Sequence, residues 1–325
     1  MNSSVVRVAV ASRSFSRHPQ LRKVLSDRYS NVTFNDSGAS LAGQQLIEFL
    51  RGHRMAITAL EKLDDALFTA VPELKVIGKY GVGLDMIDLE AMRRHGVKLG
   101  WTGGVNRRAV SELVVAFAIS LLRHIPQGDA LVRGGGWQQL KGRQLSGRTV
   151  GIIGLGHVGK DLVRMLTPFG CRILANDILP FPEFCRTHGV LQVGLDDLLR
   201  DSDVVTLHVP LDGSTRGLMT DARLDLMRRD AVLINAARGG LVDEVALRER
   251  LRDGRLAAAA FDVFTDEPPR DRELLNLPNM LSTPHIGGSS EEAILAMGLA
   301  AIDGLATAGD PIDVATGRFQ PAVSA

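Results

Sequence analysis

The feature that most constrains the fold is a glycine-rich loop between two structured segments. Residues 149–153 predict a buried strand, residues 154–159 (G-L-G-H-V-G) carry the spacing G-x-G-x-x-G, and residues 157–169 predict a helix. The bare glycine spacing is a weak signal because glycine is common. The strand before it and the helix after it supply the context that the motif requires. The segment therefore predicts the opening unit of a doubly wound α/β domain.

Each glycine of this loop has a physical role in binding a dinucleotide. Gly154 allows a tight turn, Gly156 lets the backbone approach a pyrophosphate, and Gly159 permits close packing of the helix. The helix N-terminus offers N–H groups and a partial positive charge to that pyrophosphate. Asp177, roughly 20 residues further on, can accept both hydroxyls of the adenosine ribose and repel a 2′-phosphate. No Arg or Lys stands at 178–180, so we expect NAD rather than NADP, although Asp177 could instead cap the following helix.

The composition is that of a globular protein with room for two domains. The chain has 325 residues, of which 45% are hydrophobic and 23% charged. Its net charge of +1 argues against nucleic acid or an anionic membrane as a partner. The two cysteines, Cys171 and Cys185, show neither disulfide nor metal-site spacing, so we expect no metal. The sequence shows no signal peptide and no apolar run of membrane-spanning length, which predicts a cytoplasmic protein.

Short apolar segments alternate with amphipathic ones in two separate blocks, which is typical of parallel sheets with helical crossovers. In the first block we expect strands at 5–11, 32–34, 55–59, 74–77 and 97–99 and helices at 19–25, 43–50, 64–70 and 89–94. In the second we expect strands at 149–153, 171–176, 204–207, 232–235, 257–261 and 280–282 and helices at 157–169, 222–227 and 244–253.

The connections between these blocks are less regular. A long apolar helix expected at 109–125 is equally compatible with an interdomain strut and with an ordinary buried helix. A final helix at 291–305 could return to the first block and make that domain discontinuous. After Gly309 we expect only a loose tail.

Three segments near the end of the second block place polar residues where strands end. Arg238 follows one expected strand, Glu267 lies beyond the next, and His285 follows the last. In an open α/β sheet the ligand crevice lies outside the carboxyl ends of the strands, so the three could meet there. Each also has a simpler interpretation: a surface charge, a turn residue before paired prolines, and a satisfied polar residue.

Taken together, the ordered motifs between 63 and 288 resemble the D-2-hydroxyacid dehydrogenase family. Beyond the glycine loop the resemblance includes residues 79–85 (K-Y-G-V-G-L-D), 106–112, 208–211 (H-V-P-L) and 235–247. It implies two doubly wound parallel-sheet domains, with a Rossmann NAD-binding domain at 102–286 inserted into a flavodoxin-like substrate domain at 1–101 and 287–325. It also implies a homodimer that transfers a hydride between NAD and a small D-2-hydroxy acid or 2-keto acid. The implied cofactor contacts are Gly154, Gly156, His157, Val158, Gly159, Asp177, His208, Pro210, Thr215, Ala236, Asp262 and His285.

The chemistry of keto-acid reduction explains the three catalytic residues that the resemblance implies. His285 suits the acid/base role because imidazole titrates near neutral pH. Glu267, if bonded to the ring, would orient it and favour its protonated form. Arg238 would hold the substrate carboxylate with its fixed fork of donors.

The resemblance also implies substrate contacts in the first block. Backbone N–H groups of Val82 and Gly83 would bind the carboxylate, Asn106 would lie near the substrate, and Asp262 would face the nicotinamide amide. Lys79 departs from the general pattern of the family, as does Tyr80 beside it. Lys79 could recognise a second acidic group of the substrate or could be solvated at a strand end. Ser111 stands where alanine is more usual, with uncertain effect.

Three alternatives share the same scaffold. Formate dehydrogenases characteristically have glutamine where Glu267 stands, and phosphite dehydrogenase has lysine where Val82 stands, so both are disfavoured. Non-catalytic NAD(H)-binding corepressors share the fold and the three catalytic residues but carry extra tails. We expect neither such tails nor a regulatory domain after Glu291. The sequence leaves open which hydroxy acid is the substrate, and in which direction the reaction runs.

Overall fold

The computed structural model describes residues 6–319, which form two compact units that are considered separately. Unit 1 comprises the described residues up to Asn106 and those from Glu291 onward, and unit 2 comprises Arg107–Ser290. The boundaries lie a few residues from those expected at 101/102 and 286/287. Val5, the first residue of an expected strand, lies outside the described residues.

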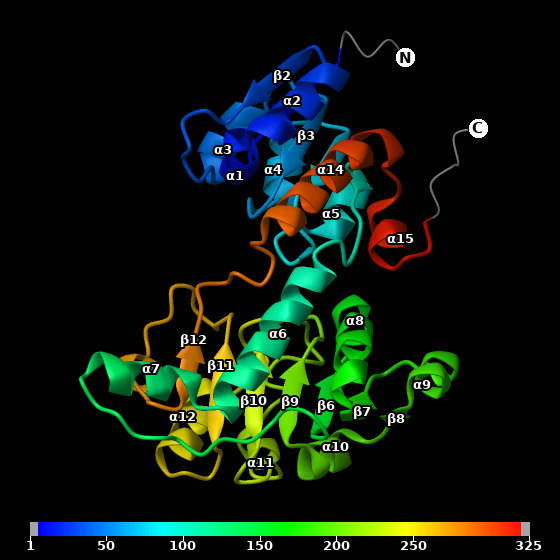
Figure 1. Cartoon of the computed structure of the whole chain (residues 1–325). Helices are drawn as coiled ribbons and strands as arrows, with labels where there is room; N and C mark the ends of the chain where they lie inside the picture. The colour runs from blue at the N-terminus through cyan, green and yellow to red at the C-terminus, as the bar shows by residue number, and fades with distance from the viewer. Residues whose placement is uncertain (1–5, 320–325) are drawn as a thin grey trace. The chain divides into compact units, whose positions relative to one another are not determined.

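Unit 1 is built on a parallel sheet with the order β2-β1-β3-β4-β5 (Figure 1). Its strands are β1 (Arg7–Val10), β2 (Asn31–Phe34), β3 (Met55–Thr58), β4 (Val76–Lys79) and β5 (Lys98–Gly100). Its helices are α1 (Arg13–Arg17), α2 (Pro19–Arg28), α3 (Gly43–Leu50), α4 (Asp65–Ala70), α5 (Leu89–Arg94), α14 (Glu291–Thr307) and α15 (Pro311–Ala315). This strand order is the flavodoxin-like one.

Helix α14 packs against β4 and β5 of unit 1, although it lies almost 200 residues beyond them in the chain. Glycines permit the close approach. A Cβ on Gly78 would lie 2.4 Å from the carbonyl oxygen of Ala301, and one on Gly100 would lie 2.1 Å from that of Gly304. The following segment is not the loose tail expected after Gly309. It forms α15, which Asp310 caps through its side chain and which packs against α5.

Unit 2 contains a parallel sheet with the order β12-β11-β10-β9-β6-β7-β8, the Rossmann arrangement extended by one strand. Its strands are β6 (Thr149–Ile153), β7 (Arg172–Asn176), β8 (Val190–Gln192), β9 (Val204–Leu207), β10 (Val232–Asn235), β11 (Ala258–Phe261) and β12 (Met280–Ser282). Its helices are α6 (Arg107–Leu122), α7 (Ile125–Arg133), α8 (His157–Leu166), a 3₁₀ turn (Thr167–Phe169), α9 (Pro182–His188), α10 (Leu195–Asp201), α11 (Asp221–Leu224), α12 (Glu244–Arg252) and α13 (Arg272–Leu275). The two sheets confirm the predicted fold class.

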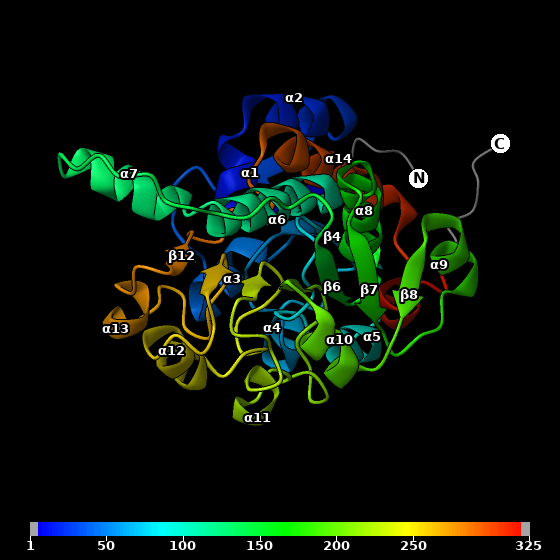
Figure 2. The same cartoon turned by 60° about the horizontal axis from the view of Figure 1, so that its bottom comes forward.

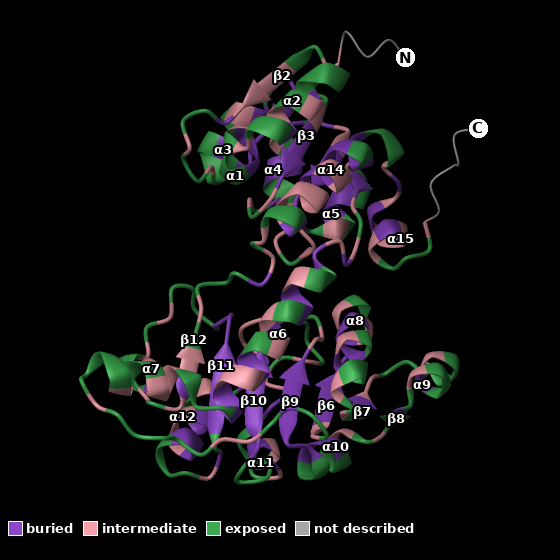
Figure 3. Ribbon diagram, in the orientation of Figure 1, coloured by how far each residue is buried: buried purple, intermediate pink, exposed green. Residues whose placement is uncertain are grey.

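Both faces of the unit 2 sheet are apolar because successive strand residues point to opposite faces and each face is covered. In β9, Val204 belongs to the cluster shared with α6 and α8, whereas Val205 packs with residues of α10, α11 and α12. The central strands β9, β10 and β11 are accordingly buried along their length (Figure 3). Helix α6 contributes Val114 and Phe117 to the cluster that contains Val204, so within unit 2 it is an ordinary buried helix.

The sequence did not predict the break after α6. His124 adopts a left-handed backbone (φ 54°), and α7 begins at Ile125 with a proline in its first turn. Figure 2 shows α7 running outward beyond α6. Among residues 6–319 no single helix has the length and apolarity to cross a membrane, although α6 and α7, bent by 63°, pass that test as a pair by length and composition alone. The segments β8, α9, α10 and α13 were also missed, because they are short and partly polar.

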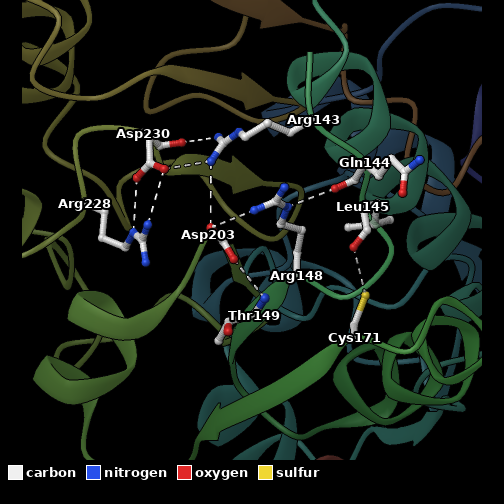
Figure 4. Close-up of polar contacts among 9 residues, drawn as sticks. All are labelled: Arg143, Gln144, Leu145, Arg148, Thr149, Cys171, Asp203, Arg228 and Asp230. Atoms are coloured by element: carbon white, nitrogen blue, oxygen red, sulfur yellow. Dashed lines mark hydrogen bonds and ion pairs between the residues drawn. The ribbon is translucent and has the colours of Figure 1, made fainter.

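The amino edge of the unit 2 sheet is held by a cluster of ion pairs (Figure 4). Asp203, which precedes β9 and is 7% exposed, accepts a hydrogen bond from the Thr149 N–H at 3.0 Å. Its other carboxylate oxygen lies 3.7 Å from Arg143 and 3.9 Å from Arg148. Arg143 also pairs with Asp230, which precedes β10, at 2.9 Å. These contacts tie the segment before β6 to the starts of two neighbouring strands.

We expect Asp203→Ala to lower the free energy of unfolding by about 2–4 kcal/mol, because the Thr149 N–H loses its acceptor and Arg148 loses its carboxylate partner, whereas Arg143 keeps Asp230. Asp230→Ala is the matched control: its side chain is 53% exposed, so the loss should stay below about 1 kcal/mol. Urea unfolding followed by circular dichroism measures both. Equal losses of unfolding free energy in the two variants would contradict the importance of burial at Asp203.

Candidate active site

The glycine loop joins β6 to α8 with the contacts that a dinucleotide site requires. Gly154 has φ +103°, and a Cβ there would lie 2.6 Å from the carbonyl oxygen of His208. A Cβ on Gly159 would lie 2.0 Å from the carbonyl oxygen of Gly154, so any side chain would separate the helix from the loop. A Cβ on Gly156, in contrast, would meet no described atom within 4 Å. The N-terminus of α8 is therefore open where a pyrophosphate would bind.

Asp177 follows the last residue of β7 and is bonded to the glycine loop. Its carboxylate accepts the N–H of Leu155 at 2.7 Å and the N–H of Leu179 at 2.8 Å. The cap of α9 is Phe181, so the alternative that Asp177 caps that helix is wrong. Gln192 supports the same loop by donating to the carbonyl oxygen of Leu179 at 2.8 Å. The position of Asp177 fits a ribose contact.

The segment after β9 lies against the glycine loop on its other side. The N–H of His208 donates to the carbonyl oxygen of Ile153 at 2.7 Å, and its ring Nε2 lies 3.0 Å from the Thr206 hydroxyl. Removal from water lowers the pKa of His208 to about 3, so its imidazole is neutral. Thr215 donates to the carbonyl oxygen of Pro210 at 2.6 Å and closes that loop.

Glu267 and His285 are brought together within unit 2. Oε2 of Glu267 lies 2.8 Å from Nδ1 of His285, and Oε1 accepts the N–H of Phe264 at 3.2 Å. Both side chains are about half exposed, at 41% and 48%. The carboxylate therefore fixes one ring nitrogen, and the ring remains accessible.

Arg238 lies in the loop after β10, and hydrogen bonds of the Asn235 side chain hold the backbone of this loop. The buried Asn235 side chain donates to the carbonyl oxygen of Arg238 at 2.9 Å and accepts the N–H of Ala237 at 3.2 Å. A Cβ on Gly239 would lie only 1.8 Å from the carbonyl oxygen of Phe264. Gly239 thus lets the Arg238 loop touch the segment that leads to Glu267. The roles of Asn235 and Gly239 were not predicted from the sequence, although an amide at a strand end is a signal for a loop-shaping residue.

Asp262 follows β11 and is bonded to the loop that carries His285. Its carboxylate accepts hydrogen bonds from Thr283, Ile286 and Gly287, and the residue is 1% exposed. Thr283 was not among the predicted site residues. The contact of Asp262 with the nicotinamide amide stays a prediction. Ala236, also predicted at the cofactor, directly follows β10.

In unit 1 the residues predicted to bind substrate lie at the end of β4, in the loop after it, and after β5. Lys79 is 3% exposed, and its ammonium donates to the carbonyl oxygens of Ala59 (2.6 Å) and Tyr80 (3.2 Å). The alternative of a solvated Lys79 is therefore wrong. Tyr80 points into the core against Phe15, at 5.5 Å between ring centroids, and does not face solvent.

The loop that contains Val82 and Gly83 follows β4. The indole N–H of Trp101 donates to the carbonyl oxygen of Val82 at 3.1 Å, a contact that the sequence did not predict. Asn106, the last residue of unit 1 before α6, is buried. The assignments of Lys79, Val82, Gly83 and Asn106 to substrate stay predictions. Ser111, on α6 in unit 2, is fully buried and donates to the carbonyl oxygen of Val158 at 3.4 Å.

Comparison with known proteins identifies the family. The model of the D-isomer specific 2-hydroxyacid dehydrogenase NAD-binding domain matches residues 115–287, more than half of the chain. This chain belongs to the D-isomer-specific 2-hydroxyacid dehydrogenase family. The segment 115–287 is accordingly an NAD-binding domain, which the open glycine loop and Asp177 fit. The described residues contain no cluster of His, Cys, Asp or Glu suited to a metal ion.

Several known proteins resemble this chain over most of its length. D-3-phosphoglycerate dehydrogenase of Rattus norvegicus is 36% identical over 283 residues, which are 86% of this chain and 52% of that protein. The enzyme of that name from Methanocaldococcus jannaschii is 37% identical over 262 residues, 79% of this chain and 50% of the other. The chain thus spans about half the length of these relatives. A crystal structure from Polaromonas sp. JS6 66, described as a D-isomer specific 2-hydroxyacid dehydrogenase, superposes with a TM-score of 0.85 at 28% identity and 98% coverage of both chains.

The first prediction from this site concerns cofactor choice. The carboxylate of Asp177 should repel a 2′-phosphate, so kcat/KM should be at least about tenfold higher with NADH than with NADPH. Asp177→Ala should narrow that ratio, at the expense of the hydrogen bonds to Leu155 and ribose. Equal efficiency of the unaltered protein with both cofactors would contradict the assignment.

The second concerns acid stability. His208 has a folded pKa of about 3, below the value of about 6.5 for an unfolded histidine, so between these pH values the unfolded chain binds the extra proton. Stability should therefore fall as pH falls through this window, with His208 contributing at most about 1.4 kcal/mol per pH unit. His208→Gln should flatten the dependence of the unfolding free energy on pH between about 6.5 and 3. An unchanged slope in the variant would refute the neutral, desolvated ring.

Proposed function

We propose that this protein is an NAD-dependent D-2-hydroxyacid dehydrogenase that interconverts a small D-2-hydroxy acid and its 2-keto acid. The observation that carries the proposal is the Glu267–His285 pair, 2.8 Å apart, in loops beyond the carboxyl ends of β11 and β12. The glycine loop lies at the carboxyl end of β6 in the same sheet. An acid/base group and a dinucleotide site at one sheet edge are what hydride transfer to a carbonyl requires.

Each protein group then has a defined task. His285 donates a proton to the carbonyl oxygen during reduction and removes it during oxidation. Because Nδ1 faces Glu267, the exchange falls to Nε2. Glu267 orients the ring and stabilises its protonated form. Arg238 binds the substrate carboxylate and polarises the carbonyl. The bound nicotinamide supplies or accepts the hydride.

The alternatives separate on activity. A corepressor-like protein would bind NADH without turning over 2-keto acids, and a formate or phosphite dehydrogenase relative would oxidise those anions instead. Glu267 bonded to His285 favours a keto-acid reductase, because a carboxylate stabilises the imidazolium that must donate the proton. Turnover of a panel of 2-keto acids with NADH, with formate and phosphite as controls, decides between them.

The catalytic assignment predicts a loss of turnover without loss of cofactor binding. His285→Ala should reduce kcat by roughly 10²–10⁴, the usual contribution of a positioned proton donor, and NADH affinity measured by fluorescence should persist. Glu267→Gln should lower kcat less than His285→Ala does, since the amide oxygen can still accept a hydrogen bond from Nδ1 but the side chain no longer carries a charge. An unchanged kcat in Glu267→Gln would make Glu267 structural.

We also propose a cytoplasmic homodimer. Both cysteines are free, and burial raises the pKa of each thiol, which suits a reducing compartment.

The dimer contact is assigned to α7 and the segment after it. Helix α7 has no buried residue, and the two segments expose Ile125 (51%), Val132 (53%) and Trp137 (90%). Monomers rarely leave such side chains uncovered together, so we assign this segment to contact with a second copy.

The assembly is testable by sedimentation velocity. Trp137→Glu should convert the dimer to a monomer, because it places a charge in the apolar contact. Ile178→Glu, at a residue 98% exposed elsewhere in unit 2, is the control and should leave the dimer intact. A protein that sediments as a monomer without substitution would refute the proposal.

A further inference from the structure

Asp262 is a buried carboxylate whose surroundings single it out. It follows Phe261, the last residue of β11, and is 1% exposed. Removing a carboxylate from water costs several kcal/mol unless hydrogen-bond donors compensate it. The donors that surround Asp262 therefore indicate the role of this buried carboxylate.

All of these donors come from one short segment, 283–287. Oδ1 accepts the hydroxyl of Thr283 at 2.5 Å and the N–H of Ile286 at 2.7 Å, and Oδ2 accepts the N–H of Gly287 at 2.7 Å. The main-chain oxygen of Asp262 accepts the N–H of His285 at 2.9 Å. Asp262 thus bonds to the chain on both sides of His285 and at His285 itself.

The conformation of His285 explains why such a clamp is needed. Its φ is +55°, in the left-handed region that is unfavourable for a residue with a Cβ. A residue keeps this conformation when its surroundings over-determine it. The bonds from Asp262 do so for the backbone, and Glu267 holds the ring at Nδ1. Together they fix where the imidazole stands.

We propose that Asp262 is a positioning residue of the reaction: its carboxylate sets the backbone of 283–287 and thereby the place of the His285 ring. This inference rests on the proposed function, because Asp262 acts through His285. The predicted contact of Asp262 with the nicotinamide amide stays a separate prediction, because Oδ2 accepts the N–H of Gly287 and a carboxylate oxygen can accept a second donor.

Asp262→Asn tests the clamp because an amide NH₂ would face the N–H of Ile286 or Gly287, donor against donor. A displaced ring should lower kcat on the order of 10²-fold, while the Kd for NADH measured by fluorescence stays within about twofold. In a His285→Ala background the same change should lower kcat no further, since the group that it positions is gone. A merely structural role would lower both backgrounds alike.

A cofactor analogue separates the clamp from a nicotinamide contact. In the 3-acetylpyridine analogue of NADH a methyl ketone replaces the amide, so the N–H donors are lost. If Asp262 positions His285, the ratio of kcat/KM for NADH and analogue should be the same in the unaltered protein and in Asp262→Asn. A ratio that collapses only in the variant would overturn the proposal in favour of an amide contact.

Thr283→Val is a milder variant that keeps the proposal testable if Asp262→Asn does not fold. It removes one donor of the clamp at nearly constant shape and should lower kcat several-fold with NADH binding unchanged. Thr167→Val is the matched control, because that hydroxyl donates to the carbonyl oxygen of Val163 at the end of α8 and should leave kcat unchanged.

The results distinguish this inference from the proposed function. Full activity of His285→Ala would overturn the proposed function itself. Inactive His285→Ala together with unaltered kcat in Thr283→Val, or with a further loss from Asp262→Asn in the His285→Ala background, would overturn the role of Asp262 alone.

Discussion

The architecture of unit 2 depends on the shared direction of its strands. Because every described strand of this sheet is parallel to its neighbours, the loops that follow them emerge at one edge. Gly154, Asp177, His208 and Asp262 each follow a different strand and still belong to this edge. Both faces of the sheet are covered, so the edge is where polar side chains can meet a ligand.

Close backbone contacts decide how near these loops approach one another. Gly159 packs on the carbonyl oxygen of Gly154, and Gly239 packs on that of Phe264, at distances where a Cβ could not be accommodated. The first contact keeps α8 against the pyrophosphate loop, and the second keeps the Arg238 loop against the approach to Glu267. Glycine at these positions therefore acts as a distance constraint within the site.

Buried polar side chains provide the remaining rigidity at both edges of the sheet. Asp203 binds backbone and guanidinium groups at the amino edge, and Asn235 and Asp262 bind loop backbone at the carboxyl edge. Each is surrounded by donors or acceptors that compensate the free-energy cost of removing its polar group from water. The proposed catalytic pair, Glu267 and His285, is by contrast about half exposed. The site thus combines buried polar supports with accessible reactive groups.

The two sheets, the glycine loop and the family could be predicted before the structure was known, because hydrophobic periodicity and motif spacing are local properties of the chain. The strands β6, β9, β10 and β12 were predicted to the residue. The contacts of individual polar side chains, in contrast, depend on how the chain folds. Lys79 is buried because strand pairing brings the carbonyl oxygen of Ala59 to its ammonium, and Asp262 is a clamp because the segment after β12 closes over it. Such partners lie about 20 or more positions apart in the chain and become neighbours only when the sheets form. A local sequence pattern therefore cannot predict these contacts.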